Sequence, residues 1–247
     1  MRFLIELSFK GTNYHGWQKQ LNANTVQAEI DTALSVICQV PIEVTGAGRT
    51  DAGVHAKQMY AHFDNNFDLD LKELKFKLNS ILPNDISVIN TFKVQDDFHS
   101  RFDATTRTYK YYIQSTKNVF NDNLYYFSRK LDVDAMNKAS SHLLGIQDFT
   151  SFSKLNTQTH TNFCNITYAK WEYYDELLVF TISANRFLRN MVRAIVGTLI
   201  NIGLSKIKPI EIKEIISSKN RGNAGYSVPS HALFLTRIEY DKEFKRV

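Results

Sequence analysis

The chain is poor in the residues that mark several common protein classes. Only two of its 247 residues are cysteines and four are prolines. Cys38 and Cys164 stand far apart and outside any C-x-x-C pair, so the sequence indicates neither a disulfide framework nor a standard zinc site. No apolar run approaches the roughly 20 residues that a membrane helix needs. The sequence starts with an alternating, strand-like pattern and not with an apolar signal segment, so we expect a cytoplasmic protein without a membrane partner.

Glycine is scarce too, and the spacing of the ten glycines excludes two nucleotide-binding loops. In the stretch "GAGRTDAGVHA", residues 46–56, four residues separate Gly48 from Gly53. A dinucleotide-binding loop needs G-x-G-x-x-G at the start of a helix, and a phosphate-binding loop needs Lys and then Ser or Thr after its second glycine. Neither requirement is met. Asp51 remains as a candidate reactive carboxylate, with a simple turn residue as the alternative.

The charge balance is basic and favours a polyanionic partner. Thirty Lys and Arg residues against 25 Asp and Glu residues give a net charge of +5. Basic residues alternate with aromatic residues in "HSRFDATTRTYKYY" (99–112) and "NRFLRNMVR" (185–193). Such a mixture can neutralise phosphates and stack on exposed bases. The alternative for each stretch is an aromatic core with arginines on its solvated side.

Hydrophobic periodicity predicts the same order of elements in both halves of the chain. In the first half we expect strands over 2–9, 42–47, 56–63 and 86–94, and helices over 25–38 and 71–81. In the second half we expect strands over 107–115, 165–174, 177–184 and 232–240, and helices over 134–145, 187–200 and 208–218. These patterns predict an α+β fold of two RRM- or ferredoxin-like βαββαβ halves, residues 1–104 and 105–247. The halves would merge into one large, mainly antiparallel sheet with helices packed on it and a central catalytic cleft.

Four motifs resemble the tRNA pseudouridine synthase A family. They are "GAGRTDAGVHA", "YHGWQKQ" (14–20), "FHSRFDATTRTYKYYI" (98–113) and "FLRNMVRAIVG" (187–197). Together they extend over nearly the whole chain. The sequence departs from the family pattern at Gln147, where His is usual, at Ala232, where Gly is usual, and at Ser100, where Ala is common. The first two departures bear on local loop geometry and substrate preference.

The resemblance implies isomerisation of uridine to pseudouridine in the anticodon stem-loop of tRNA, at positions 38, 39 and/or 40. The N1–C1′ bond is broken, the uracil turns, and C5 is joined to C1′. It further implies that no metal or organic cofactor is needed, and that a homodimer grips the tRNA at its elbow while the flexible anticodon arm supplies the base. A paralogous synthase with a different uridine target is the alternative within the family.

The resemblance also assigns roles to four residues. Asp51 would be catalytic, either as a nucleophile at the ribose or the base, or as a base that takes a proton. Arg49 would hold the rearranged RNA backbone and fill the stack that the flipped uridine leaves. Tyr109 would stack on the uracil and offer its hydroxyl for proton transfer at C5. Arg193, expected one helical turn after Arg189, would pair with Asp51 and aim it. A surface phosphate contact and a structural strand tyrosine are the alternatives for Arg49 and Tyr109.

Two other functions compete with this one on the sequence alone. A non-catalytic RNA-binding protein built from two RRM-like units would carry the aromatic RNP strand motif, which is missing here. A glycosidic-bond hydrolase normally uses two carboxylates, and no second acid flanks Asp51 within its loop.

Overall fold

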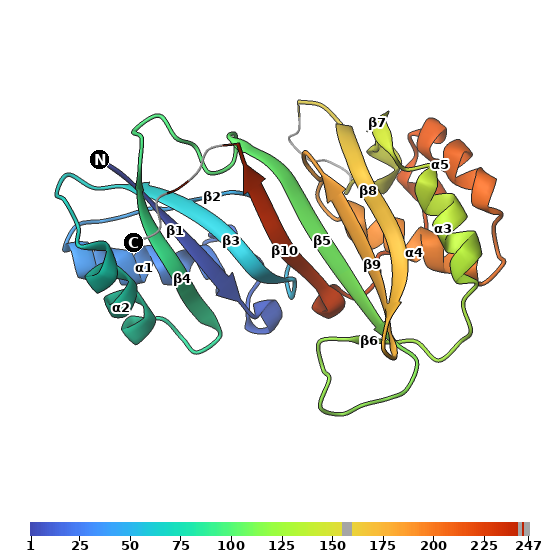
Figure 1. Cartoon of the computed structure of the whole chain (residues 1–247), viewed down its shortest axis with the longest axis horizontal. Helices are drawn as coiled ribbons and strands as arrows, with labels where there is room; N and C mark the ends of the chain where they lie inside the picture. The colour runs from blue at the N-terminus through green and yellow to red at the C-terminus, as the bar shows by residue number, and fades with distance from the viewer. Residues whose placement is uncertain (155–159, 242–243, 245–247) are drawn as a thin grey trace. The chain divides into compact units, whose positions relative to one another are not determined.

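The computed structural model describes residues 1–154, 160–241 and 244. Two compact units are present: Met1–Thr106 with the described residues from Leu235 onward, and Arg107–Phe234. The described residues contain five α-helices and ten strands, and the strands belong to one mixed sheet (Figure 1). The predicted α+β class with one large sheet is therefore confirmed.

The first unit is built on a run of long antiparallel strands. Strand β1 (Arg2–Phe9) pairs with β3 (His55–Asp64) on one side and with β4 (Ile86–Val94) on the other. The short β2 (Thr45–Gly46) adds to β3, and the last strand, β10 (Leu233–Tyr240), follows β3 in the strand order. Residues 47–54, which connect β2 to β3, therefore lie at one end of these strands.

Two capped helices cover this unit. Helix α1 (Val26–Cys38) begins where the Thr25 side chain accepts a hydrogen bond from the Ala28 amide, and α2 (Leu71–Ile81) begins where Asp70 accepts from the Glu73 amide. Their buried apolar residues recur at helical spacing and include Ile30, Leu34, Leu74 and Leu78. Both helices match the ranges predicted from the sequence to within one residue.

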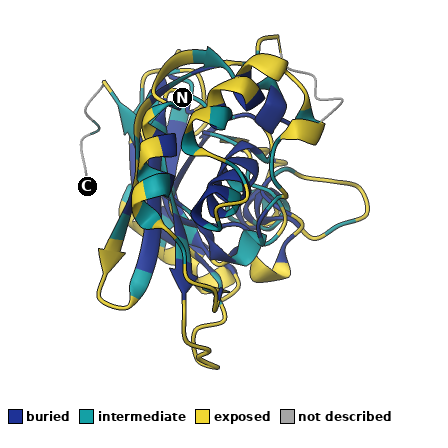
Figure 2. Cartoon of the chain, turned by 90° about the vertical axis from the view of Figure 1, so that its right-hand side faces the viewer, coloured by how far each residue is buried: buried dark blue, intermediate teal, exposed yellow. Residues whose placement is uncertain are grey.

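The second unit has the strand order β5-β9-β8-β7. The strands are β5 (Ala104–Gln114), β7 (Gly145–Asp148), β8 (Phe163–Tyr174) and β9 (Leu177–Ala184), and the short β6 (Tyr125–Tyr126) runs parallel to β5. Three helices accompany them: α3 (Val133–Ser141), α4 (Met191–Gly203) and α5 (Ile212–Ser218). Helix α4 is buried along most of its length and forms the core of this unit, whereas exposed residues gather in loops and on outer helix faces (Figure 2).

The three helices predicted in the second unit differ from the structure at their ends: α3 ends at Ser141 and not at residue 145, α5 begins at Ile212 after a short 3-10 turn, and α4 begins late. The sequence pattern placed a helix over residues 187–200, but α4 begins at Met191 because Asn190 adopts a left-handed conformation with a φ of 66°. Arg189 therefore precedes the helix, and the expected spacing of Arg189 and Arg193 by one turn of the same helix does not occur. The short strands β6 and β7 were not predicted either.

The final strand is part of the first compact unit. The Ile238 amide donates to Oε1 of Gln58 at 2.9 Å, and the Tyr240 hydroxyl donates to the Ser100 carbonyl at 2.6 Å. The Tyr240 ring also meets Tyr60 edge-on, with ring centres 5.3 Å apart. The functional division into residues 1–104 and 105–247 stays a prediction, and β10 packs with the N-terminal strands.

A buried histidine in the first unit predicts acid sensitivity. His62 on β3 is only 5% exposed, and its Nδ1 accepts a hydrogen bond from the Ser100 amide at 3.2 Å. Burial, and then the positive charges of Arg2 and His99, lower the pKa of His62 to about 4. An unfolded histidine has a pKa of about 6.5, so between these values the unfolded state binds more protons. We expect stability to fall by on the order of 2 kcal/mol as the pH drops from 7.5 to 4.5.

Denaturant unfolding at a series of pH values measures this effect. His62→Gln cannot take up the proton, so its free energy of unfolding should depend less on pH over this range than that of the wild type. His15→Gln, at an exposed position, is the control and should keep the wild-type dependence. Parallel pH curves for the wild type and His62→Gln would contradict the assignment.

Candidate active site

Asp51 opens a tight turn between β2 and β3. The Val54 amide donates to the Asp51 carbonyl at 3.1 Å, and Gly53 has a φ of 77°. A positive φ at the third position is typical of a type II turn, and glycine adopts it without a steric penalty. The Asp51 side chain is half-buried. Gly53, the third glycine of the 46–56 motif, thus serves the turn.

The N-terminal segment after β1 holds this turn through its backbone. The Trp17 amide donates to the Thr50 carbonyl at 3.3 Å, and the Gly53 amide donates to the Tyr14 carbonyl at 3.2 Å. Gly16 has a φ of 95°, and a Cβ there would overlap the Thr50 carbonyl oxygen. The close approach therefore requires glycine, and the turn is fixed on both sides of Asp51.

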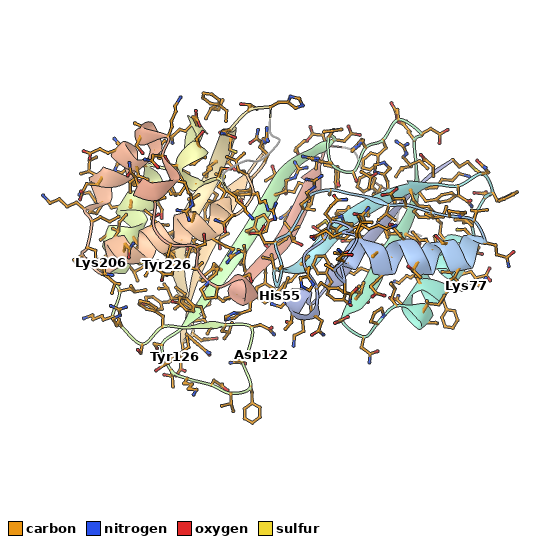
Figure 3. All side chains as sticks on the ribbon, turned by 180° about the vertical axis from the view of Figure 1, so that it is seen from behind. His55, Lys77, Asp122, Tyr126, Lys206 and Tyr226 are labelled. Carbon is orange, nitrogen blue, oxygen red and sulfur yellow. The ribbon has the colours of Figure 1, made fainter. Side chains whose placement is uncertain are left out.

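His55, at the start of β3, ties the same two segments together and is labelled in Figure 3. It is buried, and its Nδ1 accepts a hydrogen bond from the Gly11 amide at 3.0 Å. A Cβ at Gly11 would overlap the Val54 carbonyl oxygen, so this contact also depends on glycine. The histidine of the "GVHA" motif is thus a structural residue that anchors the turn.

Arg49 lies two residues before Asp51 and is exposed. Its Nε donates to Oε1 of Gln18 at 3.1 Å. Gln18 in turn donates from Nε2 to Oε1 of Gln27 at 2.9 Å, and Gln27 lies in the first turn of α1. The structure therefore brings Arg49 and Asp51 together in one loop and connects the arginine to the helix behind it.

Tyr109 lies in the second unit, on β5 opposite Ile182 of β9. Its ring is half-buried and meets Phe187 edge-on, with ring centres 5.2 Å apart. Phe187 belongs to the "FLRN" stretch that precedes α4. Tyr109 is therefore neither a fully buried core residue nor a freely exposed one.

Arg193 lies in the first turn of α4, also in the second unit. Its Nε donates to the Val228 carbonyl at 2.8 Å, and the Val228 amide donates to the Arg193 carbonyl at 3.3 Å. Its positive charge acts on Tyr111, whose pKa is nevertheless raised because the ring is buried. Tyr111 donates from its hydroxyl to the Pro229 carbonyl at 3.0 Å. The hydrogen bond from Nε to Val228 thus helps to orient the guanidinium.

The segment 225–229, which contains the Val228 partner of Arg193, packs closely on α4. A Cβ at Gly197 would overlap the carbonyl oxygen of Tyr226, which is labelled in Figure 3. The Gly225 amide donates to Oγ1 of Thr198 at 2.8 Å. The glycine of the "AIVG" motif therefore admits the neighbouring backbone, and this approach sets the position of residues 225–229 beside Arg193.

Sequence reasoning predicted four site residues but not the groups that contact them. Arg49 and Asp51 share one loop of the first unit, and Tyr109 and Arg193 lie in the second unit. Gln18, Gln27 and Val228 were not singled out from the sequence. Gln18 could have been found, since it belongs to the "YHGWQKQ" motif. The Val228 contact could not, because its backbone carbonyl accepts the hydrogen bond and any residue type could supply that group.

The three departures from the family pattern have local explanations. Ser100 is fully buried, and its hydroxyl donates to the Thr45 carbonyl at 2.6 Å. Gln147 donates from Nε2 to the carbonyls of His142 and Leu144, at 3.0 and 2.9 Å, in the turn that follows α3. Ala232 is fully buried in a short 3-10 turn. These hydrogen bonds of Ser100 and Gln147 are made to Thr45, His142 and Leu144, which are not predicted site residues.

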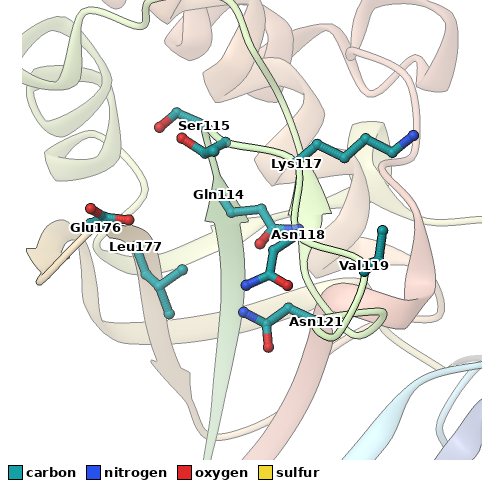
Figure 4. Close-up of a pocket in the computed structure, with 9 residues that line it drawn as sticks. Gln114, Ser115, Lys117, Asn118, Val119, Asn121, Glu176 and Leu177 are labelled. Atoms are coloured by element: carbon teal, nitrogen blue, oxygen red, sulfur yellow. The ribbon is translucent and has the colours of Figure 1, made fainter.

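A pocket of about 320 Å³ lies in the second unit beside the loop that follows β5 (Figure 4). Its lining includes Gln114, Asn118, Asn121 and Leu177, and none of the four predicted site residues. Among the described residues, no group of three or more His, Cys, Asp or Glu side chains could hold a metal ion. Over the same residues, no helix has both the length and the apolar character that a membrane crossing requires.

The sequence model of the family described as tRNA pseudouridine synthase matches residues 7–103 and 139–241. The chain belongs to the tRNA pseudouridine synthase family. The tRNA pseudouridine synthase A of Bacteroides fragilis is 50% identical over 245 residues, covering 98% of this chain and 97% of that protein. The enzyme of the same name from Parabacteroides distasonis is 49% identical over 244 residues, with 98% and 97% covered. The one from Pseudoalteromonas translucida is 37% identical over 247 residues, with 99% and 94% covered.

The stretches matched by the tRNA pseudouridine synthase family contain three of the four predicted site residues. Arg49 and Asp51 fall in the first stretch and Arg193 in the second. Tyr109 lies in the interval between them. Similarity to the named synthases, in contrast, runs through nearly the whole chain and includes that interval.

Proposed function

We propose that this tRNA pseudouridine synthase uses Asp51 as its single catalytic carboxylate and acts on uridines 38, 39 and/or 40 of the anticodon stem-loop. Membership of the family makes the chain an isomerase that converts uridine to pseudouridine in tRNA. The observation that carries the residue assignment is the turn at Asp51. Its backbone is fixed on both sides by the segment 11–17, and Arg49 lies beside it.

The reaction needs a positioned carboxylate and a base that has left the RNA stack. The N1–C1′ bond breaks, C5 forms a new bond to C1′, and the C5 proton is lost while N1 gains one. Asp51 can act as a nucleophile at the ribose or the base, or it can remove a proton during glycosidic cleavage. Either route requires a flipped uridine, and flipping costs a few kcal/mol. We propose that Arg49 fills the position in the RNA stack that the flipped uridine leaves.

We further propose that two merged halves form a central cleft, in which Arg193 pairs with Asp51 and Tyr109 stacks on the flipped uracil. Three observations support this. The family match falls in two separate stretches, one in each predicted half. Arg193 is oriented through Nε by Val228, and Tyr109 is half-buried beside Phe187. An arginine beside the carboxylate would aim it at the substrate through a charge-assisted hydrogen bond.

Tritium at uridine C5 separates this function from its rivals. A synthase releases the tritium to water and leaves the RNA strand intact. A non-catalytic RNA-binding protein releases nothing, and a glycosidic hydrolase frees uracil. Release at positions 38–40 supports the proposal, whereas release only from uridines elsewhere would make the chain a synthase with a different target.

The uridines that the enzyme serves in the cell are found by comparing strains. Pseudouridine should disappear from positions 38–40 of the tRNAs in a strain that lacks the gene, and should return when the wild-type gene is restored. Recognition through tRNA shape and phosphates, with contacts at the elbow, would let one active site serve neighbouring uridines in a flexible arm. We place this activity in the cytoplasm, where tRNA is modified.

We also propose a twofold dimer in which one tRNA contacts both subunits. A tRNA spans more than one small domain between its elbow and its anticodon, so a second subunit would extend the binding surface. Light scattering at micromolar concentration should give twice the chain mass of 28.5 kDa. A fully active monomer would contradict a groove shared between subunits.

A further inference from the structure

Arg49 is connected through Gln18 to Gln27, and backbone groups fix which atom donates and which accepts in these hydrogen bonds. Nε2 of Gln27 donates to the Val44 carbonyl at 2.8 Å, and Oε1 of Gln27 accepts from the Lys19 amide at 3.0 Å. A carbonyl can only accept and an amide N–H can only donate, so the Gln27 amide has one possible orientation. Gln27 is 3% exposed, which removes water as an alternative partner.

Gln27 then fixes the orientation of Gln18. Because Oε1 of Gln27 faces Gln18 at 2.9 Å, Gln18 must present its Nε2 as the donor. Oε1 of Gln18 consequently points to the other side, where it accepts from Nε of Arg49 at 3.1 Å. The backbone groups of Val44 and Lys19 thus fix the orientation of both glutamine amides, and through them the acceptor that faces the exposed Arg49 guanidinium.

We infer that Gln18 and Gln27 form a positioning relay that holds the Arg49 guanidinium in the orientation needed to replace a flipped uridine. The inference rests on the proposed function of the Asp51 loop. Bonding at Nε engages one of the five N–H donors of the arginine and leaves four for RNA phosphates or bases. It also restricts a long side chain that is otherwise exposed, so that less freedom is lost when RNA binds.

The relay predicts a loss in rate without a matching loss in binding. Gln18→Leu keeps the approximate size of the side chain and the net charge but removes the acceptor for Arg49. We expect kcat to fall about tenfold, which is the effect of one hydrogen bond to a charged group. The dissociation constant for tRNA should change less than twofold, because no phosphate contact is lost. Gln18→Ala repeats the test with a smaller side chain.

A double-mutant cycle distinguishes positioning from a purely structural role. If Gln18 acts through Arg49, Gln18→Leu should change kcat less than twofold when Arg49 is already alanine. A structural role of Gln18 would slow the enzyme by the same factor in both backgrounds, and that result would overturn the relay. Gln95→Leu is the control, since Gln95 is an exposed glutamine of the first unit and takes no part in the Gln18–Gln27 pair. Its kcat should stay at the wild-type value.

The flipping step gives a second readout. A tRNA with 2-aminopurine next to the target uridine brightens when its neighbour leaves the stack. Gln18→Leu and Arg49→Ala should slow this fluorescence rise by similar factors, while the Asp51→Asn enzyme should still show it. A normal rise with Gln18→Leu would overturn the relay.

The outcomes for the relay and for the proposed function are distinguishable. An inactive Asp51→Asn enzyme together with additive effects of Gln18→Leu and Arg49→Ala would overturn the relay and leave the catalytic assignment intact. An active Asp51→Asn enzyme would overturn the catalytic assignment, whatever the cycle between Gln18 and Arg49 shows.

Discussion

Asp51→Asn is expected to abolish turnover while leaving the protein folded and able to bind tRNA. Asparagine keeps the size of the side chain and, like aspartate, is a common turn residue, so stability should change by roughly 1 kcal/mol or less. Binding should stay within about tenfold, which is roughly 1.4 kcal/mol. The amide can neither form the covalent adduct nor accept the proton, so release of C5 tritium should fall below detection.

The control for this result is an Asp→Asn change elsewhere in the same unit. Asp68 is exposed and pairs with Lys93 at 2.7 Å, and it takes no part in the proposed chemistry. Asp68→Asn should release tritium at the wild-type rate. If Asp51→Asn did the same, Asp51 would be only a turn residue.

Arg193→Met is expected to lower kcat by about a hundredfold or more. The change keeps a long, flexible side chain but removes the guanidinium that we propose to aim the Asp51 carboxylate. A misaimed catalytic group commonly costs a factor of that order. The loss of the hydrogen bond from Nε to the Val228 carbonyl should lower stability by only about 1 kcal/mol.

Arg189→Met provides the matched comparison. Arg189 lies just before α4 and carries the same charge, so both variants lose equal electrostatic attraction for RNA. If Arg193 aims Asp51, its replacement should lower kcat in single-turnover experiments at saturating enzyme, whereas Arg189→Met should act on KM and on the salt dependence of binding. Equal effects of the two variants on kcat would contradict the pairing of Arg193 with Asp51.

The helices and long strands of the first unit were predictable because local signals mark both their faces and their ends. Thr25 and Asp70 are capping residues directly before the first apolar residues of α1 and α2. Apolar residues alternate with other residues along much of β1 in the sequence, although the structure buries β1 at consecutive positions from Phe3 to Leu7. In the second unit the same reasoning overran the start of α4, since nothing in the apolar pattern reveals that Asn190 adopts a left-handed conformation.

The short strands, and which strands pair with one another, could not be predicted from the sequence as well as the helices could. Strands β6 and β7 have two and four residues, too few for a period to emerge. The residues of β10 likewise do not reveal which strand lies beside it in the sheet. That neighbour depends on contacts such as that between Tyr240 and Tyr60, which join residues far apart along the chain.

The candidate site was predictable to the extent that side-chain chemistry marks it. Asp51 and Arg49 stand out through their motif, but the support around them is made by backbone and by amides. Gly16 is needed because the Thr50 carbonyl approaches it, and Gln27 because its side-chain amide bonds both the Val44 carbonyl and the Lys19 amide. Such requirements become visible only when the segments are placed in space.

The most direct test of the account locates the product nucleotide by nucleotide. Unmodified tRNA is incubated with the wild type or with Asp51→Asn, and pseudouridine is then mapped by carbodiimide labelling and primer extension. We expect stops that report pseudouridine at positions 38, 39 and/or 40 after incubation with the wild type, and no such stops after incubation with Asp51→Asn. Stops of equal strength with both enzymes would contradict catalysis by Asp51.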